Sequence, residues 1–130
     1  MLRHEQRGQP FHGEFSSADA SALSEANSRL SLYPPGSTSA ITLASTDQVL
    51  ITDIKVGVGA TALTVTVYDG SDTTVGAGEV IDKGGYAVNT SQIQNRVIGH
   101  YCQAGTYPKV KTSAAGQVDV IITGIILKAG

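Results

Sequence analysis

Hydrophobic and polar residues alternate with a period of two through much of the chain after residue 36. In the stretch LTVTVYDGSD, residues 63–72, leucine and valine alternate with threonine before an Asp-Gly pair ends the run. Residues 49–58 alternate in the same way, and a short Gly59-Ala60 connection joins the two runs. Successive side chains of a strand point to opposite faces, so this pattern predicts strands that are buried on one face. We expect the two runs to pair as an antiparallel hairpin.

The alternation also predicts which side chains of residues 49–58 face the core. Asp53, Lys55 and Gly57 fall on the polar face. The opposite, apolar face is expected to contain Leu50, Ile54, Val56 and Val58.

Further strands are predicted between glycine-rich turns, at residues 39–43, 79–81, 86–88, 96–102, 107–112 and 117–127. The last of these is the longest, and beyond Ile122 it becomes apolar on both faces. Such a strand is expected in the centre of its sheet or beneath an arm or a neighbouring subunit. The pattern therefore predicts an all-β, antiparallel β-sandwich of jelly-roll-like form over residues 37–130.

Residues 1–36 lack this alternation and are predicted to form an extended N-terminal arm. Ser16 and Asp19 resemble a capping box in which Asp replaces Glu, and a short helix is possible within residues 17–30. Its apolar stripe would contain only Leu23, Ala26 and Leu30, so the helix would be marginal alone. A disordered tail is the alternative for this segment.

The composition and charge of the chain argue against some classes of partner. The chain has 130 residues, of which 41% are hydrophobic, and a formal net charge of −2. Such a balance provides no basic field for nucleic acid, so we expect no nucleic-acid partner. The charged start, MLRHEQRGQPFHGEF, does not resemble a signal peptide, and no membrane partner is expected. The single Cys102 cannot form an intrachain disulfide, which fits synthesis in a reducing cytoplasm.

Few residues suggest a catalytic or metal-binding role. Asp69 and Asp72 flank a turn, but the sequence that follows lacks the closing Glu of a calcium loop, so turn formation explains them better. His100 and Cys102 would share one face of a strand, yet no motif supplies the third group that a nucleophilic cysteine needs. No phosphate loop and no metal-binding motif is present. We therefore predict a protein that is not an enzyme and uses no metal or cofactor.

Two stretches of the chain carry a family resemblance. They are VLITDIKVGVGATALTVTVYDGSDTT, with its strand ending in Tyr-Asp-Gly, and GTYPKVKTSAAGQVDVIITGIIL, with its closing Val/Ile strand. This arrangement resembles the small β-sandwich virion proteins of tailed bacteriophages, especially the capsid decoration (cement) proteins. The resemblance implies a structural protein on the outer surface of the virion capsid, which binds the major capsid protein, forms a homotrimer and stabilises the head.

The arm is expected to make the contacts to the shell or to a neighbouring subunit. Its apolar and arginine side chains belong to a segment that was predicted to have no core of its own, and Tyr33 with Pro34 and Pro35 was expected to act as a hinge. The candidate partner-contact residues are Leu2, Arg3, Arg7, Phe11, Phe15, Leu30, Leu32 and Tyr33. The alternative function is a phage tail or fibre accessory module that binds host-surface carbohydrate through clustered, exposed tyrosines.

Overall fold

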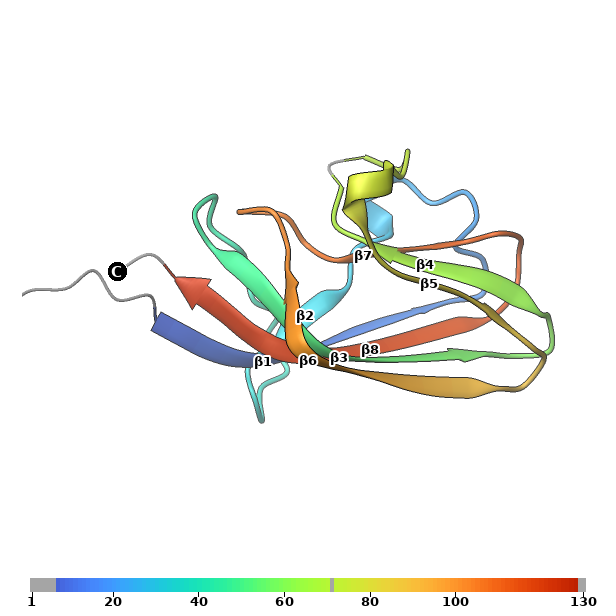
Figure 1. Cartoon of the computed structure of the whole chain (residues 1–130), viewed down its shortest axis with the longest axis horizontal. Coiled ribbons are helices and arrows are strands. Elements are labelled where there is room, and N and C mark those ends of the chain that lie inside the picture. Colours follow the sequence, from blue (N-terminus) through green and yellow to red (C-terminus); the bar gives the residue numbers. More distant parts are fainter. Residues whose placement is uncertain (1–6, 71, 129–130) are drawn as a thin grey trace, which may run out of the picture.

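The protein folds into two antiparallel β-sheets that pack on one another, as the computed structural model of residues 7–70 and 72–128 shows (Figure 1). The large sheet has the strand order β2-β1-β8-β3-β6 and the small sheet the order β5-β4-β7. The predicted all-β antiparallel sandwich is thus confirmed.

The strand bounds are as follows. The large sheet contains β1 (Arg7–Ser17), β2 (Ser31–Tyr33), β3 (Gln48–Val58), β6 (Ser91–Tyr101) and β8 (Val118–Lys128). The small sheet contains β4 (Leu63–Tyr68), β5 (Val80–Tyr86) and β7 (Lys109–Thr112). Two single 3₁₀ turns, η1 (Glu25–Asn27) and η2 (Ala77–Glu79), lie in the connections. Among the described residues there is no helix of the length and apolarity needed to cross a membrane.

The core lies between the two sheets and consists mainly of branched aliphatic side chains. Burying one such side chain stabilises the fold by roughly 1.5–3 kcal/mol before the cost of ordering the chain is counted. Fully buried examples come from β2, β3, β4, β7 and β8: Leu32, Val49, Ile51, Ile54, Val56, Val65, Val67, Val110, Val118, Val120, Ile122 and Ile126.

A β-bulge in β3 changes which residues of that strand face the core. The pairing of β3 with β8 shifts register between Ile51 and Asp53, so Thr52 is the extra residue on that side. The pairing with β6 shifts at the same place, but there the additional residues belong to β6. Val49 and Ile51 are buried before the bulge, whereas Ile54 and Val56 are buried after it. The prediction that Leu50 faces the core was therefore wrong, because a bulge inverts the two-residue period.

The predicted hairpin between residues 49–58 and 61–69 is also wrong. β3 pairs with β6 and β8, while β4 pairs with β5 and β7. The Gly59–Ala62 connection therefore passes from one sheet to the other. Alternation reveals that both strands have one buried face, but it does not reveal whether that face belongs to the same sheet.

The N-terminal segment belongs to the sandwich and not to a separate arm. β1 pairs with β8 along its whole length, from Arg7 opposite Lys128 to Ser17 opposite Val118. β8 consequently lies between β1 and β3 in the middle of the large sheet, as its apolar character predicted. The predicted boundary between an arm, 1–36, and a sandwich, 37–130, is corrected, because the sheet already includes Arg7.

No helix forms within residues 17–30 apart from the single turn η1. The Ser17 and Asp19 side chains instead bond to nearby backbone N–H groups, those of Asp19 and Ser21. Such local bonds compete with a helix. The carbonyl of Ala20 accepts a hydrogen bond from the Thr112 N–H, and Ala20 itself is buried in the core. Tertiary contacts thus hold this segment in an irregular path.

The weaker strand predictions had mixed outcomes. Residues 39–43 and 87–88 are not in strands, whereas β5, β6, β7 and β8 overlap the remaining predicted segments. Leu43 nevertheless packs against the core, and its N–H donates to the Tyr107 hydroxyl at 2.8 Å.

Candidate functional site

The predicted partner-contact residues do not form an exposed arm surface. Leu2 and Arg3 lie outside the described residues, and Arg7 is described only as the first residue of β1. Four apolar members of the set that the structure describes are buried in the core: Phe11, Phe15, Leu30 and Leu32. Their assignment to partner contact is corrected, because the physical reason for it, a segment without a core, does not apply.

Tyr33 is the last residue of β2 and is partly buried. Its ring stacks on that of His12 in β1, with the two ring centroids 5.4 Å apart. Tyr33 pairs with His12 in the strand register as well. Tyr33 thus lies within the regular pairing of β2 with β1, at the point where the predicted hinge was to begin.

The outward face of the large sheet presents a row of four residues in register across four strands. Glu14 of β1 lies opposite Ile121 of β8, which lies opposite Lys55 of β3, which in turn lies opposite Ile93 of β6. All four side chains are exposed. Ile93 and Ile121 are 62% and 43% exposed, which places two large aliphatic groups in water on one face.

The rows on either side are polar. On one side, the Thr123 hydroxyl donates to the Asp53 carboxylate at 3.0 Å. On the other, the Ser16 hydroxyl donates to the Asp119 carboxylate at 2.5 Å. The two exposed isoleucines, with Lys55 between them, therefore lie between two polar rows. We refer to the row Glu14–Ile121–Lys55–Ile93 as the outer row.

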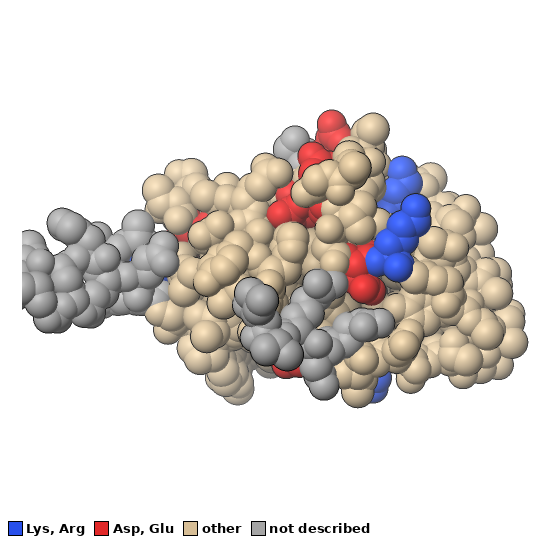
Figure 2. Space-filling view, viewed as in Figure 1, with Lys and Arg blue, Asp and Glu red and all other residues tan. Residues whose placement is uncertain are grey.

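Charged side chains are sparse on the side of the molecule that Figure 2 shows. Acidic groups gather near its upper edge and basic groups lie beside them, while most of the view is uncharged. A surface of this kind favours contacts made by shape and apolar area over long-range attraction of a strongly charged partner.

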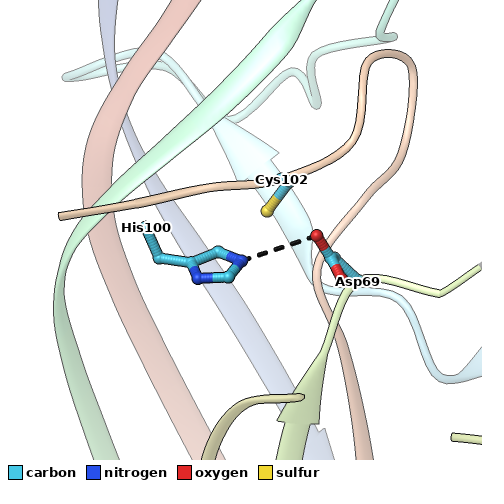
Figure 3. A group of neighbouring side chains, drawn as sticks. All are labelled: Asp69, His100 and Cys102. Carbon is cyan, nitrogen blue, oxygen red and sulfur yellow. Dashed lines mark ion pairs between the residues drawn. The ribbon is translucent and has the colours of Figure 1, made fainter. Parts of the chain in front are cut away.

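A second group of residues lies buried between the two sheets. Asp69 directly follows β4 of the small sheet, whereas His100 is in β6 of the large sheet and Cys102 directly follows it. Figure 3 shows the three side chains pointing toward one another. We call this group the Asp–His–Cys cluster.

The cluster is tightly packed but incompletely hydrogen-bonded. His100 Nε2 lies 3.5 Å from Asp69 Oδ2, and the ligand atoms of all three residues lie within 4.8 Å of one another. Asp69 Oδ2 accepts a hydrogen bond from the Gln103 N–H at 3.2 Å. Asp69 Oδ1 and His100 Nε2 are buried and, within the described residues, make no hydrogen bond. An unpaired buried polar atom costs about 1–3 kcal/mol, so two in one cluster require an explanation.

Burial is the main reason why the Cys102 thiol stays protonated. Burial raises the pKa of Cys102 far above its ordinary value, and the negative charge of Asp69 raises it further, while Lys109 lowers it. A thiol of this kind is a poor nucleophile, because the thiolate is the reactive form.

Backbone hydrogen bonds position the residues of the cluster. The Asp69 N–H donates to the Glu79 carbonyl at 3.0 Å, and the Cys102 N–H donates to the Val49 carbonyl at 2.8 Å. Gly99, directly before His100, has φ +85°, and a Cβ there would lie 2.8 Å from Leu50 Cδ1. Glycine at this position therefore lets β6 pass close to β3 and positions the imidazole.

Lys109 lies close to the cluster and is almost completely buried, with 1% exposure. Its ammonium group donates to the carbonyls of Gly70 and Tyr107 and lies 3.3 Å from Glu25 Oε1. Arg29 in turn makes a two-point contact with the Glu25 carboxylate. This buried lysine ties the turn after β4 to β7 and to the segment around η1.

The sequence predicts only part of the cluster. The two-residue spacing predicts that His100 and Cys102 share one face of a strand. It does not predict that Asp69 lies beside them, because Asp69 reaches them only when the two sheets pack. Asp72, its predicted neighbour, is exposed and accepts a hydrogen bond from the Thr74 N–H at 2.8 Å, as expected of a turn residue.

The tyrosines do not form the clustered platform that a carbohydrate-binding module would need. Tyr68 and Tyr86 are buried. Tyr107 is half-buried and accepts the bond from Leu43. Tyr33 and Tyr101 are on β2 and β6, which are the opposite edges of the large sheet.

Comparison of the chain with protein-family models, with curated proteins and with solved structures found no match.

Proposed function

We propose that this protein is a structural component of a tailed-phage virion that binds the outer surface of the capsid and stabilises it. The outward face of the large sheet is the part that contacts the shell. The observation that carries this proposal is the outer row, in which the exposed Ile121 and Ile93 lie on either side of Lys55 and between two polar rows.

The physical argument begins with the cost of exposed aliphatic groups. A single exposed isoleucine is ordinary, but two in one row of a sheet face, with only Lys55 between them, form the kind of partly apolar patch that interfaces bury. The strands beneath are fixed by the core, so the face is rigid and loses little entropy on binding. Many copies on one particle then need only modest affinity each.

The strand order supports the jelly-roll form of the sandwich. Residues 28–30 bond to β7 through the Leu30 N–H to the Pro108 carbonyl and the Val110 N–H to the Ser28 carbonyl. The segment that ends in β2 thus extends the small sheet beyond β7 as well as the large sheet beyond β1. The chain crosses between the sheets from β3 to β4 and at each step from β5 to β8, and crossings of this kind occur in the two-sheet jelly rolls of viral capsid proteins. Fold alone does not determine function, so this likeness supports the proposal only by analogy.

Oligomerisation as a trimer, and contacts from Leu2 and Arg3, remain part of the proposal. An oligomer would cover the free edge of β6, which runs for 11 residues at the border of the large sheet. Mass photometry of the purified protein gives the subunit number directly.

A shell-binding experiment tests the role of the outer row. We expect the double variant Ile93→Ser with Ile121→Ser to sediment with undecorated capsids at least tenfold more weakly than the wild type, because each serine removes most of the apolar contact area. Thermal unfolding of both proteins checks that the fold is retained. Removing residues 1–6 in a separate variant measures the contribution of Leu2 and Arg3.

The matched control alters the small sheet. Lys83 of β5 and Thr66 of β4 face outward on that sheet and pair with one another. The double variant Thr66→Ala with Lys83→Ala should bind shells as the wild type does. Equal binding by the outer-row variant and the wild type would refute the proposed contact face.

A further inference from the structure

We propose that Asp69, His100 and Cys102 form a binding site for a divalent zinc-type metal ion that joins the two sheets. One residue comes from the end of β4 in the small sheet, and the other two come from the end of β6 in the large sheet. The inference is independent of the proposed binding to a shell.

The donor atoms are of the kinds that zinc prefers. A carboxylate oxygen, an imidazole nitrogen and a thiolate sulfur are the three side-chain donors of protein zinc sites. The sulfur favours zinc or another thiophilic ion over Mg²⁺ and Ca²⁺, which take oxygen donors. Together the carboxylate and the thiolate supply two negative charges, which balance a divalent cation.

The distances are close to those that an ion requires. With bonds of about 2.0–2.3 Å, the donor atoms around a tetrahedral ion lie roughly 3.3–3.8 Å apart. The 3.5 Å between His100 Nε2 and Asp69 Oδ2 already falls in this range. Cys102 Sγ lies within 4.8 Å of the other donors, so a side-chain shift of about 1 Å completes the geometry.

The unpaired atoms of the cluster have the ion as their natural partner. Asp69 Oδ1 and His100 Nε2 are buried and make no hydrogen bond to any residue that the structure describes, and both can act as donor atoms for a metal. Asp69 is only 3% exposed, so water has little access to its carboxylate. The His100 side chain is 26% exposed and gives the ion a path from solvent.

Hydrogen bonds from neighbouring groups hold Asp69 and Cys102 in place, as such bonds hold the ligands of known metal sites. The Gln103 N–H holds Asp69 Oδ2, and the Gln48 side-chain amide donates to the Cys102 carbonyl at 2.9 Å. When the ion binds, the Cys102 thiol loses its proton to solvent and the sulfur bonds to the metal. The ion then acts as a cross-link between the sheets.

Titration with Co²⁺ tests the site in the folded, full-length protein. The chain contains one cysteine, so any thiolate-to-cobalt charge-transfer absorption must come from Cys102. We expect this absorption to saturate at one ion per chain and to disappear when Zn²⁺ is added. Zn²⁺ at a hundredfold excess over its Kd should also raise Tm by about 10 °C.

Variants identify the donors. Cys102→Ala should abolish the charge-transfer absorption, and Asp69→Asn should weaken Co²⁺ binding at least tenfold. The matched control is His12→Ala, because His12 lies on the outward face next to Glu14 at 3.9 Å and is the kind of surface histidine that binds metals weakly. This variant should bind Co²⁺ as the wild type does.

Three results would overturn the proposal. They are the absence of thiolate-to-cobalt absorption in folded wild-type protein at saturating Co²⁺, saturation at one ion per two chains, and loss of binding in His12→Ala. The first two need no variant, so they remain decisive even if a cluster variant fails to fold.

Discussion

The outer row and the Asp–His–Cys cluster each contain side chains in an environment that is unfavourable for their polarity. In the outer row, Ile93 and Ile121 are 62% and 43% exposed to water. In the cluster, a buried carboxylate and a partly exposed imidazole each contain one buried atom that makes no hydrogen bond within the described part of the chain. The first region has apolar groups outside and the second has polar groups inside.

The two exceptions differ in what they cost the fold. A half-exposed isoleucine loses less of its contact with water on folding than a buried one does, so it contributes less to the free energy of unfolding. A buried unpaired carboxylate loses its hydration only on folding and therefore opposes it. The outer row can therefore bind a partner at little cost to the stability of the fold. In the cluster, the cost of burying the carboxylate has to be offset by a bound ligand or by neighbouring groups such as Lys109.

The largest effect should come from the buried lysine. Lys109→Ala removes an ammonium group that satisfies two carbonyls, and it leaves a cavity, so we expect the free energy of unfolding to fall by about 3–5 kcal/mol. Urea denaturation followed by circular dichroism measures it. Lys55→Ala in the outer row is the matched control and should change stability by less than about 0.5 kcal/mol. Similar losses in both variants would remove the contrast between the regions.

Two neighbouring isoleucines of β8 sharpen the comparison within one strand. Ile122 is fully buried and Ile121 is 43% exposed. Ile122→Ala should lower the free energy of unfolding by about 2–4 kcal/mol, since it opens a cavity. Ile121→Ala should lower it by less than about 1 kcal/mol. Equal losses, measured by the same denaturation, would mean that β8 does not separate core from surface as described.

Gly99 tests how closely β6 approaches β3 beside the cluster. Gly99→Ala forces a Cβ toward Leu50 Cδ1 and the Ile51 carbonyl at φ +85°, so we expect a loss of about 1–3 kcal/mol. Gly85→Ala in β5 is the control, because a Cβ there meets no atom within 4 Å. Thermal unfolding compares the two. A Gly99→Ala protein as stable as the wild type would contradict the observed approach.

The smallest expected effect is on the thermal stability at acidic pH. The Ala44 N–H bonded to the Asp47 carboxylate lowers its pKa below the ordinary 3.8, Lys128 lowers it further, and burial partly opposes both. A lowered folded pKa adds stability that is complete above the unfolded value and is lost as the pH falls through the folded value. Asp47→Asn should therefore flatten the decline of Tm below about pH 4. An unchanged decline would show that other carboxylates cause it.

The fold class could be predicted from the sequence because alternation is a local property. The runs that became β4 and β8 each show their buried face in the sequence. Sheet membership is not local: β3 and β4 follow one another and still lie in different sheets. The bulge at Thr52 and the pairing of β1 with β8 over more than 100 residues of chain were likewise outside the reach of a period count.

The same distinction explains the candidate sites. The alternation around Phe11 is short and includes Gly13, so this segment is predicted to lack a core, yet Phe11 and Leu32 are both buried in the sandwich. Asp69 and His100 are 31 residues apart and meet through the packing of the sheets. Only His100 and Cys102, two residues apart, could be related from the sequence.

The most direct test of the outer row uses a thiol placed in it. The native Cys102 is fully buried, so in an Ile121→Cys variant the new thiol is the one that reacts with a maleimide reagent in the folded protein. The account predicts rapid labelling of the free protein and at least tenfold slower labelling on undecorated capsids. A Lys83→Cys variant, on the outward face of the small sheet, should label equally fast in both states. Equal labelling of the Ile121→Cys variant with and without capsids would contradict the proposal that the large sheet binds the shell.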